Sequence, residues 1–257
     1  MQKIKEFYDL HQYPKANQYT SNQKRTNQKI ITKILRSANI TEKDLMGKRI
    51  LDIGCGTGEK SIFFAKNGAK EVVSVDFSLG QLSELEKKVK KEKLSNITIE
   101  KKDIIKDNLL DLKKFDLIFC LGVLHHTENP YLGFKKISSL LKNDGIIVIG
   151  LYHKYSRLRY RIQRFFLRTL ISKDPEKIIN FLLTSKFTKK FKKAPISTLY
   201  DRYAVPYESY HTLKEIKKWF SKNNIKPINN SLKFKKIESL NVLEKKTIFF
   251  IGGKRFI

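Results

Sequence analysis

Short apolar runs alternate with longer amphipathic stretches through the middle of the chain. Five such runs predict buried strands, at residues 49–53, 71–75, 96–100, 115–121 and 145–151. Between them, apolar residues recur at helical spacing, which predicts helices over residues 58–67, 79–91 and 131–141. Strands and helices that alternate in this way indicate βαβ crossovers, and therefore a doubly wound, mostly parallel α/β sheet.

The pattern changes on both sides of this core. A polar lead-in occupies residues 1–46, in which residues 28–35 predict a short amphipathic helix. Residues 152–210 interrupt the alternation, and a helical pattern resumes over 211–224. A final strand at 246–252 and a weaker one near 225–234 predict an antiparallel hairpin at the sheet edge.

These boundaries favour one domain with additions, because single α/β domains commonly reach this length. We expect it to span residues 1–257, in four parts. They are an N-terminal lid (1–46), a cofactor-binding core (47–151), a basic acceptor-side insertion (152–210), and a final helix with strands (211–257).

Composition and charge indicate the cellular compartment and the possible partners. The 257 residues are 40% hydrophobic and include only two cysteines, Cys55 and Cys120, which favours a reducing compartment over a disulfide framework. The sequence has no apolar run long enough to span a bilayer and no signal-peptide pattern at residues 1–10, so we expect a cytoplasmic protein. A formal net charge of +28 would attract RNA or an anionic membrane, although the Lys, Asn and Ile content is also typical of AT-rich genomes.

A glycine-rich loop follows the first predicted strand. It reads Asp52-Ile53-Gly54-Cys55-Gly56-Thr57-Gly58, and Asp76 ends the next strand about 20 residues later. Glycines there permit a tight turn and close approach of backbone N–H groups to a ligand, while the acid can bind ribose hydroxyls. A dinucleotide-binding site is the rival interpretation, but its third glycine is replaced by Glu59.

Further motifs follow in order along residues 47–151. They are Asp76-Phe77, Lys102-Asp103-Ile104, the strand from Phe115 to Phe119, Gly122-Val123-Leu124-His125-His126 and the turn from Leu140 to Gly145. With the glycine loop, they resemble class I S-adenosylmethionine-dependent methyltransferases, particularly the group that includes the quinone-biosynthesis enzymes. The resemblance implies a Rossmann-like sheet of seven strands and S-adenosyl-L-methionine as the cofactor. It also implies cofactor contacts from Asp52, Gly54, Cys55, Gly56, Gly58, Asp76, Phe77, Asp103, Ile104 and Leu121.

Catalytic residues are harder to assign, because the methyl donor is already activated and the protein mainly supplies orientation. His125 and His126 lie where the carboxyl edge of the sheet is expected, and either could act as a base. Alternatively, both only shape the pocket. His211 is expected to cap or pack, Asn129-Pro130 to begin a helix, and no metal is expected.

The insertion is strongly basic. Residues 153–193 hold thirteen lysines and arginines against Asp174 and Glu176, and one helical face would carry Leu158, Ile162, Phe165, Phe166 and Leu170. Three interpretations compete: a cap whose apolar face packs on the core, a helix on a membrane surface, or an RNA-binding surface. Candidate pocket residues near its end are Tyr203, Tyr207, Glu208 and Tyr210, while Tyr8, Tyr13 and Tyr19 of the lid could close the cofactor side.

The sequence therefore predicts a methyltransferase that acts on a small-molecule or lipid-like acceptor. An RNA methyltransferase and a catalytically silent protein that binds S-adenosylmethionine are the alternatives.

Overall fold

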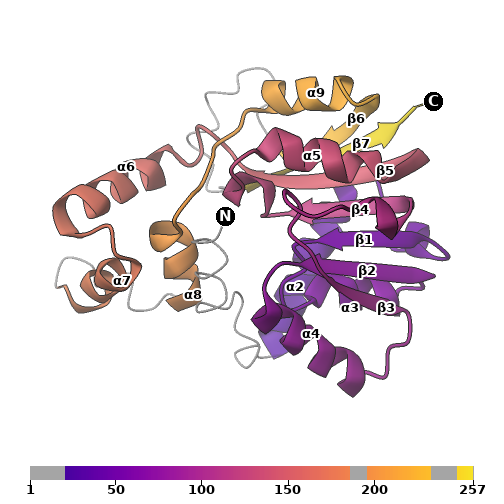
Figure 1. Cartoon of the computed structure of the whole chain (residues 1–257), viewed down its shortest axis with the longest axis horizontal. Helices are drawn as coiled ribbons and strands as arrows, with labels where there is room; N and C mark the ends of the chain where they lie inside the picture. Colours follow the sequence, from indigo (N-terminus) through magenta and orange to yellow (C-terminus); the bar gives the residue numbers. More distant parts are fainter. Residues whose placement is uncertain (1–20, 186–195, 233–247, 257) are drawn as a thin grey trace.

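A computed structural model describes residues 21–185, 196–232 and 248–256. Its centre is a seven-stranded sheet in the order β3-β2-β1-β4-β5-β7-β6 (Figure 1). The strands are β1 (Arg49–Ile53), β2 (Glu71–Asp76), β3 (Ile97–Lys101), β4 (Phe115–Leu121), β5 (Leu141–Tyr152), β6 (Ile225–Asn230) and β7 (Ile248–Arg255). The first five strands pair in parallel, while β7 runs antiparallel to both β5 and β6. The predicted seven-stranded sheet with its closing hairpin is confirmed.

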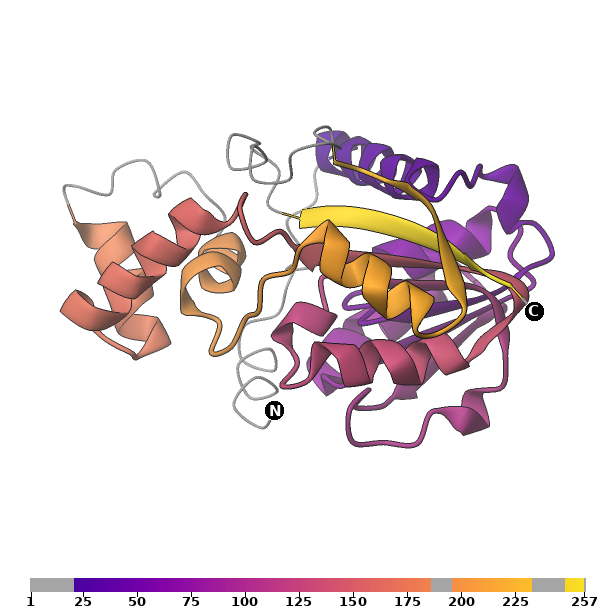
Figure 2. The ribbon, with the colours of Figure 1, turned by 90° about the horizontal axis from the view of Figure 1, so that it is seen from above.

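Helices cover both faces of the sheet (Figures 1 and 2). They are α2 (Ser21–Arg36), α3 (Glu59–Lys66), α4 (Leu79–Lys91), α5 (Pro130–Ser139) and α9 (Leu213–Ser221), with 3-10 turns η2 (Lys43–Leu45), η3 (Leu110–Leu112) and η4 (Leu124–His126). Successive strand residues point to opposite faces of the sheet. Because helices cover both faces, each central strand is buried on both sides and its sequence is one continuous apolar run. In β1, Ile50 packs with α2 and α3, whereas Leu51 joins the cluster that includes α5 and α9.

Local signals set several element boundaries as expected. The side chain of Asn129 accepts a hydrogen bond from the backbone N–H of Leu132 (3.0 Å), with Pro130 as the first residue of α5. His211 is a packing residue: its Nδ1 lies 3.0 Å from Oε1 of Glu215, and its ring packs against Trp219. Strand β5 starts at residue 141, earlier than predicted, because Leu141 already pairs with Phe115 of β4; the register then shifts, and pairing resumes between Ile146 and Leu117.

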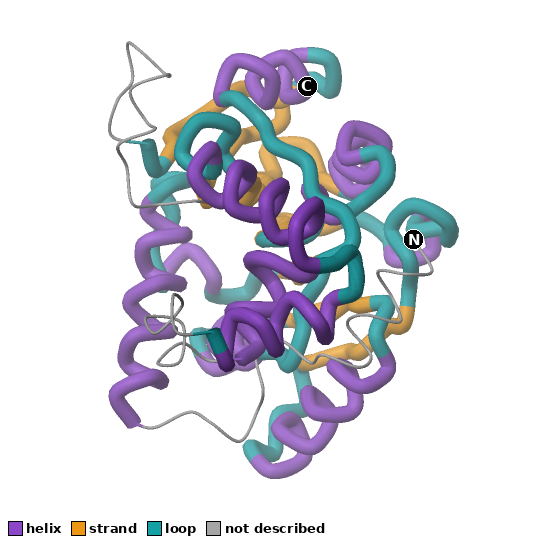
Figure 3. The backbone as a smooth tube through the Cα atoms, turned by 90° about the vertical axis from the view of Figure 1, so that its left-hand side faces the viewer, coloured by secondary structure: helices purple, strands orange, loops and turns teal. Residues whose placement is uncertain are grey.

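The insertion forms a separate helical layer beyond the carboxyl end of β5. It contains α6 (Leu158–Phe166), the π-helical turn η5 (Leu167–Ile171), α7 (Pro175–Thr184), α8 (Ile196–Leu199) and the π-helical turn η7 (Tyr200–Ala204). Figure 3 views the molecule from the insertion side, with these helices in front of the strands. They share a small core of their own, including Ile178, Leu182, Leu199 and Tyr203. None of the described helices is long and apolar enough to cross a bilayer.

Candidate functional site

One cavity of about 410 Å³ lies at the carboxyl ends of β1, β2 and β4. This is the edge where open α/β sheets bind ligands. Eight of the ten predicted cofactor contacts line it: Gly54, Cys55, Gly56, Asp76, Phe77, Asp103, Ile104 and Leu121. His125 and His126 line it as well. The sequence motifs therefore meet at a single site.

The other two predicted contacts, Asp52 and Gly58, do not line the cavity. Asp52 is fully buried beneath the loop, where its Oδ2 accepts a hydrogen bond from the hydroxyl of Ser61 (2.8 Å). Its Oδ1 has no hydrogen-bond partner among the described residues and lies 3.5 Å from Nζ of Lys60. Burial raises the pKa of Asp52, against the effect of Lys60. Gly58 precedes α3 with φ +83°, and a Cβ there would lie 2.1 Å from Leu85.

The glycine loop is held against the end of β2 by Asp76. One carboxylate oxygen of Asp76 accepts the N–H of Gly56 (2.9 Å), and the other accepts the N–H of Ser78 (3.0 Å). Burial raises the pKa of Asp76, and these backbone donors oppose that rise. At Gly54 (φ +63°), a Cβ would lie 2.1 Å from Cγ2 of Val123, so only glycine fits there. Asp103 holds its own turn by accepting the N–H of Ile105 (2.9 Å).

The two histidines differ in their surroundings. His125 is fully buried, and neither ring nitrogen has a hydrogen-bond partner among the described residues. Its ring stacks on Tyr152 with centroids 3.7 Å apart. Burial, with the charges of His126, Arg157 and His211, lowers the pKa of His125 well below its ordinary value. His126 has Nδ1 3.0 Å from the carbonyl oxygen of Tyr207 and Nε2 3.8 Å from Oδ1 of Asp201.

The insertion contributes Asp201 to the cavity. Oδ2 of Asp201 accepts the hydroxyl of Tyr152 (3.0 Å), and both residues line the cavity beside His126. Burial lowers the pKa of His126, while the carboxylate of Asp201 acts in the opposite direction. One part of the wall is apolar, from Ile30, Ile31 and Ile34 of α2 and from Ile248 and Phe250 of β7. Charged and polar side chains also line the cavity: Glu59, Lys60, Gln81, Lys102 and Thr127.

Several predicted pocket residues lie elsewhere. Tyr203, Tyr207, Glu208 and Tyr210 do not line the cavity. Tyr203 is buried in the core of the insertion, and Glu208 is bound by Arg157, which precedes α6, and by Arg164 within it. Tyr8, Tyr13 and Tyr19 lie outside the described residues. No group of three or more potential metal-binding side chains occurs within the described ranges.

A family described as "Methyltransferase domain" matches residues 45–224, which is more than half of the chain. The chain belongs to this family. It is a class I methyltransferase of the S-adenosylmethionine-dependent type, and the family cofactor is S-adenosyl-L-methionine. This membership excludes the rival dinucleotide interpretation. It agrees with the presence of Glu59 where the dinucleotide fingerprint has its third glycine. Glu59 lies at the start of α3, and its carboxylate binds Nζ of Lys88 (2.6 Å).

Relatives of this methyltransferase differ in their acceptors. The ubiquinone biosynthesis O-methyltransferase of Glaesserella parasuis is 35% identical over 130 residues, covering 48% of this chain and 54% of that protein. The tRNA U34 carboxymethyltransferase of Campylobacter hominis is 34% identical over 110 residues, covering 41% and 36%. The chain thus spans about half the length of the curated relatives it matches, or less.

A solved structure shares the fold over nearly the whole chain. The magnesium protoporphyrin IX methyltransferase of Synechocystis PCC 6803 with bound SAH has a TM-score of 0.58 and 16% identity. The likeness covers 99% of this chain and 93% of that one.

Proposed function

We propose that this methyltransferase transfers the methyl group of S-adenosylmethionine to a hydroxyl on a small, largely apolar acceptor. One observation carries the proposal: a single cavity joins the glycine loop to an apolar wall that ends in His126, Tyr152 and Asp201. An apolar wall with a few convergent polar groups is typical of small-molecule sites. The name of the Glaesserella parasuis relative, an O-methyltransferase, supports a hydroxyl acceptor.

The residues of the loop fit the cofactor. Gly54 and Gly56 line the cavity without side chains, and Asp76 is a buried carboxylate held in place at its edge. Asp76 would bind the ribose hydroxyls, Asp103 and Ile104 the adenine, and Phe77 and Leu121 would pack against the cofactor. Asp52 would act from below by orienting Lys60, which lines the cavity. When bound, S-adenosylmethionine supplies a methyl group activated by the sulfonium charge.

His126 would accept the proton of the acceptor hydroxyl. A carbonyl oxygen only accepts hydrogen bonds, so the contact with Tyr207 places the proton of the neutral ring on Nδ1 and leaves the lone pair on Nε2. The lowered pKa keeps His126 neutral near pH 7. The carboxylate of Asp201 would stabilise the imidazolium that forms. His125 would shape the wall and would not act as the base, because burial lowers its pKa well below the ordinary value and makes it a weak proton acceptor.

The decisive experiment separates donor binding from transfer. The protein and methyl-labelled S-adenosylmethionine would be incubated with lipid, small-metabolite, protein and RNA fractions of a cell extract. Label in the lipid or metabolite fraction would support the proposal, whereas label in nuclease-sensitive RNA would favour the RNA alternative. Tight donor binding without transfer to any fraction would favour the silent alternative.

Two variants test the assigned roles once an acceptor is found. His126→Gln should lower turnover by roughly 10²–10⁴-fold, the usual contribution of a positioned base, with unchanged donor affinity. Asp76→Ala should abolish donor binding, as isothermal titration would measure. Normal turnover by His126→Gln would remove the base from the mechanism, and unchanged affinity in Asp76→Ala would remove the ribose contact.

The cytoplasmic location remains part of the proposal. It rests on the two cysteines, both of which are free and buried.

A further inference from the structure

Most apolar side chains of α6 and η5 face solvent, while Tyr160 and Leu167 pack against the core of the insertion. The sequence predicted one apolar face here, and as a cap that face would have packed on the core. Instead, Phe165 is 64% exposed and Leu170 is 72% exposed. We call this surface the α6 face; it consists of Leu158, Ile162, Phe165, Phe166, Leu170 and Ile171, all of which are exposed. Six large apolar side chains on one short segment form a patch of the kind that marks an interaction site.

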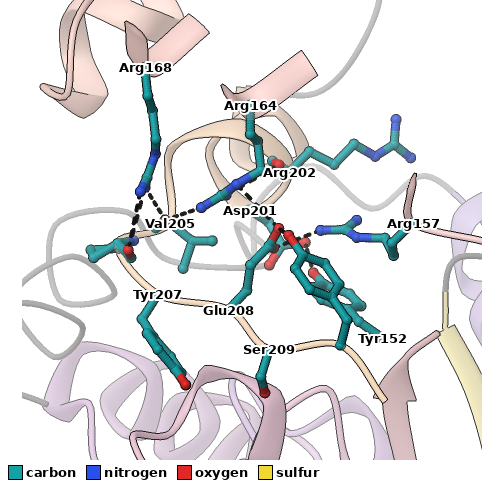
Figure 4. Close-up of polar contacts among 12 residues, drawn as sticks. Tyr152, Arg157, Arg164, Arg168, Asp201, Arg202, Val205, Tyr207, Glu208 and Ser209 are labelled. Carbon is teal, nitrogen blue, oxygen red and sulfur yellow. Dashed lines mark hydrogen bonds and ion pairs between the residues drawn. The ribbon is translucent and has the colours of Figure 1, made fainter. Parts of the chain in front are cut away.

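Three arginines in or next to the same segment, Arg157, Arg164 and Arg168, point inward (Figure 4). Nη2 of Arg157 lies 2.8 Å from Oε2 of Glu208, and Nε of Arg164 lies 3.2 Å from Oε1 of the same carboxylate. Arg164 and Arg168 each donate to the carbonyl oxygen of Val205, at 2.9 and 2.7 Å. Rotating the segment to bury Phe165 would break these buried contacts. The charges therefore fix the outward orientation of the α6 face.

We propose that the α6 face binds the surface of an anionic lipid bilayer. Exposed cations lie before, within and after residues 158–171 in the sequence. Lys154 precedes this segment, Arg159 lies within it, and Lys173 and Lys177 follow it. Apolar side chains that enter the boundary between head groups and acyl chains, flanked by lysines and arginines, are what an interfacial helix needs. The 14 positions from 158 to 171 are too few to span a bilayer, so the segment would lie along the surface.

Charge argues against the other occupants. A second copy of this chain would bring another +28 against the same basic insertion, so repulsion opposes self-association through this face. RNA would need free arginines and stacking rings, but three arginines here are bound internally and four of the six apolar side chains are aliphatic. An anionic lipid surface satisfies both the exposed cations and the apolar side chains.

The test is flotation of the full chain with vesicles, without donor or acceptor. Vesicles of phosphatidylcholine containing phosphatidylglycerol should carry the protein upward, and phosphatidylcholine alone should carry little. Replacing both phenylalanines, Phe165→Ser with Phe166→Ser, should weaken binding by roughly tenfold or more, because two exposed rings lose their insertion. Arg159→Glu with Lys173→Glu should also weaken binding, and only to the anionic vesicles.

A matched control is Leu110→Ser, since Leu110 is 66% exposed and lies far from the insertion in sequence. Its binding should equal that of the unchanged protein. The proposal is overturned if the unchanged protein fails to bind anionic vesicles, or if the double phenylalanine variant binds as well as Leu110→Ser does. A dimer that the double variant converts to a monomer in light scattering would also overturn it. Because the assay contains no acceptor, its failure would leave the proposed transfer reaction untouched.

Discussion

Glu208 should be one of the most sensitive positions for stability outside the central core. Its side chain is 2% exposed and bridges Arg157 and Arg164, whose side chains are 1% and 7% exposed. Glu208→Gln removes the negative charge and leaves two buried guanidinium groups without it. Breaking a buried pair on one side costs about 3–5 kcal/mol. The amide oxygen still accepts one hydrogen bond, worth about 1 kcal/mol, so we expect a net loss of about 3 kcal/mol in the free energy of unfolding.

Urea denaturation of the full chain, followed by circular dichroism, measures this loss. Glu84→Gln is the matched control, because Glu84 binds Nζ of Lys87 at 2.6 Å and the Lys87 side chain is 69% exposed. Surface pairs contribute about 1 kcal/mol or less, so this control should remain close to the unchanged protein. If Glu208→Gln costs no more than Glu84→Gln, Arg157 and Arg164 are solvated in solution. In that case, their contacts with Glu208 and Val205 do not orient the α6 face.

Three further predictions concern the site. Gly54→Ala should abolish donor binding in a titration, because the added Cβ would lie 2.1 Å from Val123. The control Gly47→Ala has a similar φ and nothing within 4 Å of the added Cβ, so it should bind the donor normally. Equal donor affinities of the two variants would contradict the close approach at Gly54. Stability should fall as the pH is lowered from about 7.5 to 5.5, because the unfolded chain takes up protons near pH 6.5 while burial lowers the pKa of His125. His125→Phe should reduce that slope in urea titrations, by up to about 1.4 kcal/mol per pH unit; an unchanged slope would mean that His125 is protonated in the fold. Burial raises the pKa of both Cys55 and Cys120. Alkylation by iodoacetamide at pH 8, followed by mass spectrometry, should therefore be far slower in the folded protein than in urea. Rapid labelling of the folded protein would count against the burial of the two thiols.

The central sheet was predictable because its strands are buried on both faces. The predicted ranges 49–53 and 115–121 coincide with β1 and β4, whose residues are almost all buried. Strand ends were harder to place. Strand β7 continues through Gly252 and Gly253, although glycine has a low strand propensity. A Cβ at Gly252 would meet Ala38 and one at Gly253 would meet Phe220, so close packing against neighbouring elements requires glycine there.

The acceptor side of the cavity was only partly predictable. The sequence indicated an amphipathic helix at residues 28–35, but which wall its isoleucines would form depends on tertiary packing. Asp201 reaches Tyr152 from 49 positions away, and no local pattern records such a pairing. Glu208 was a reasonable pocket candidate by position. Its carboxylate is instead used by Arg157 and Arg164, which a sequence pattern does not reveal.

The orientation of α6 shows why helical spacing alone left the interpretation of the insertion open. Amphipathic spacing identifies two faces of a helix but does not say which one is buried. The apolar face is usually buried, because buried charges are costly unless they are paired. Here Glu208 and the carbonyl oxygen of Val205 lie close enough to pair Arg157, Arg164 and Arg168, which removes much of that cost. The pairing partners lie 37 to 51 positions from the arginines, so the choice of face is decided by long-range contacts. The same contacts take three cations out of the basic surface, and the charge that remains available to an anionic partner lies on the residues around the α6 face.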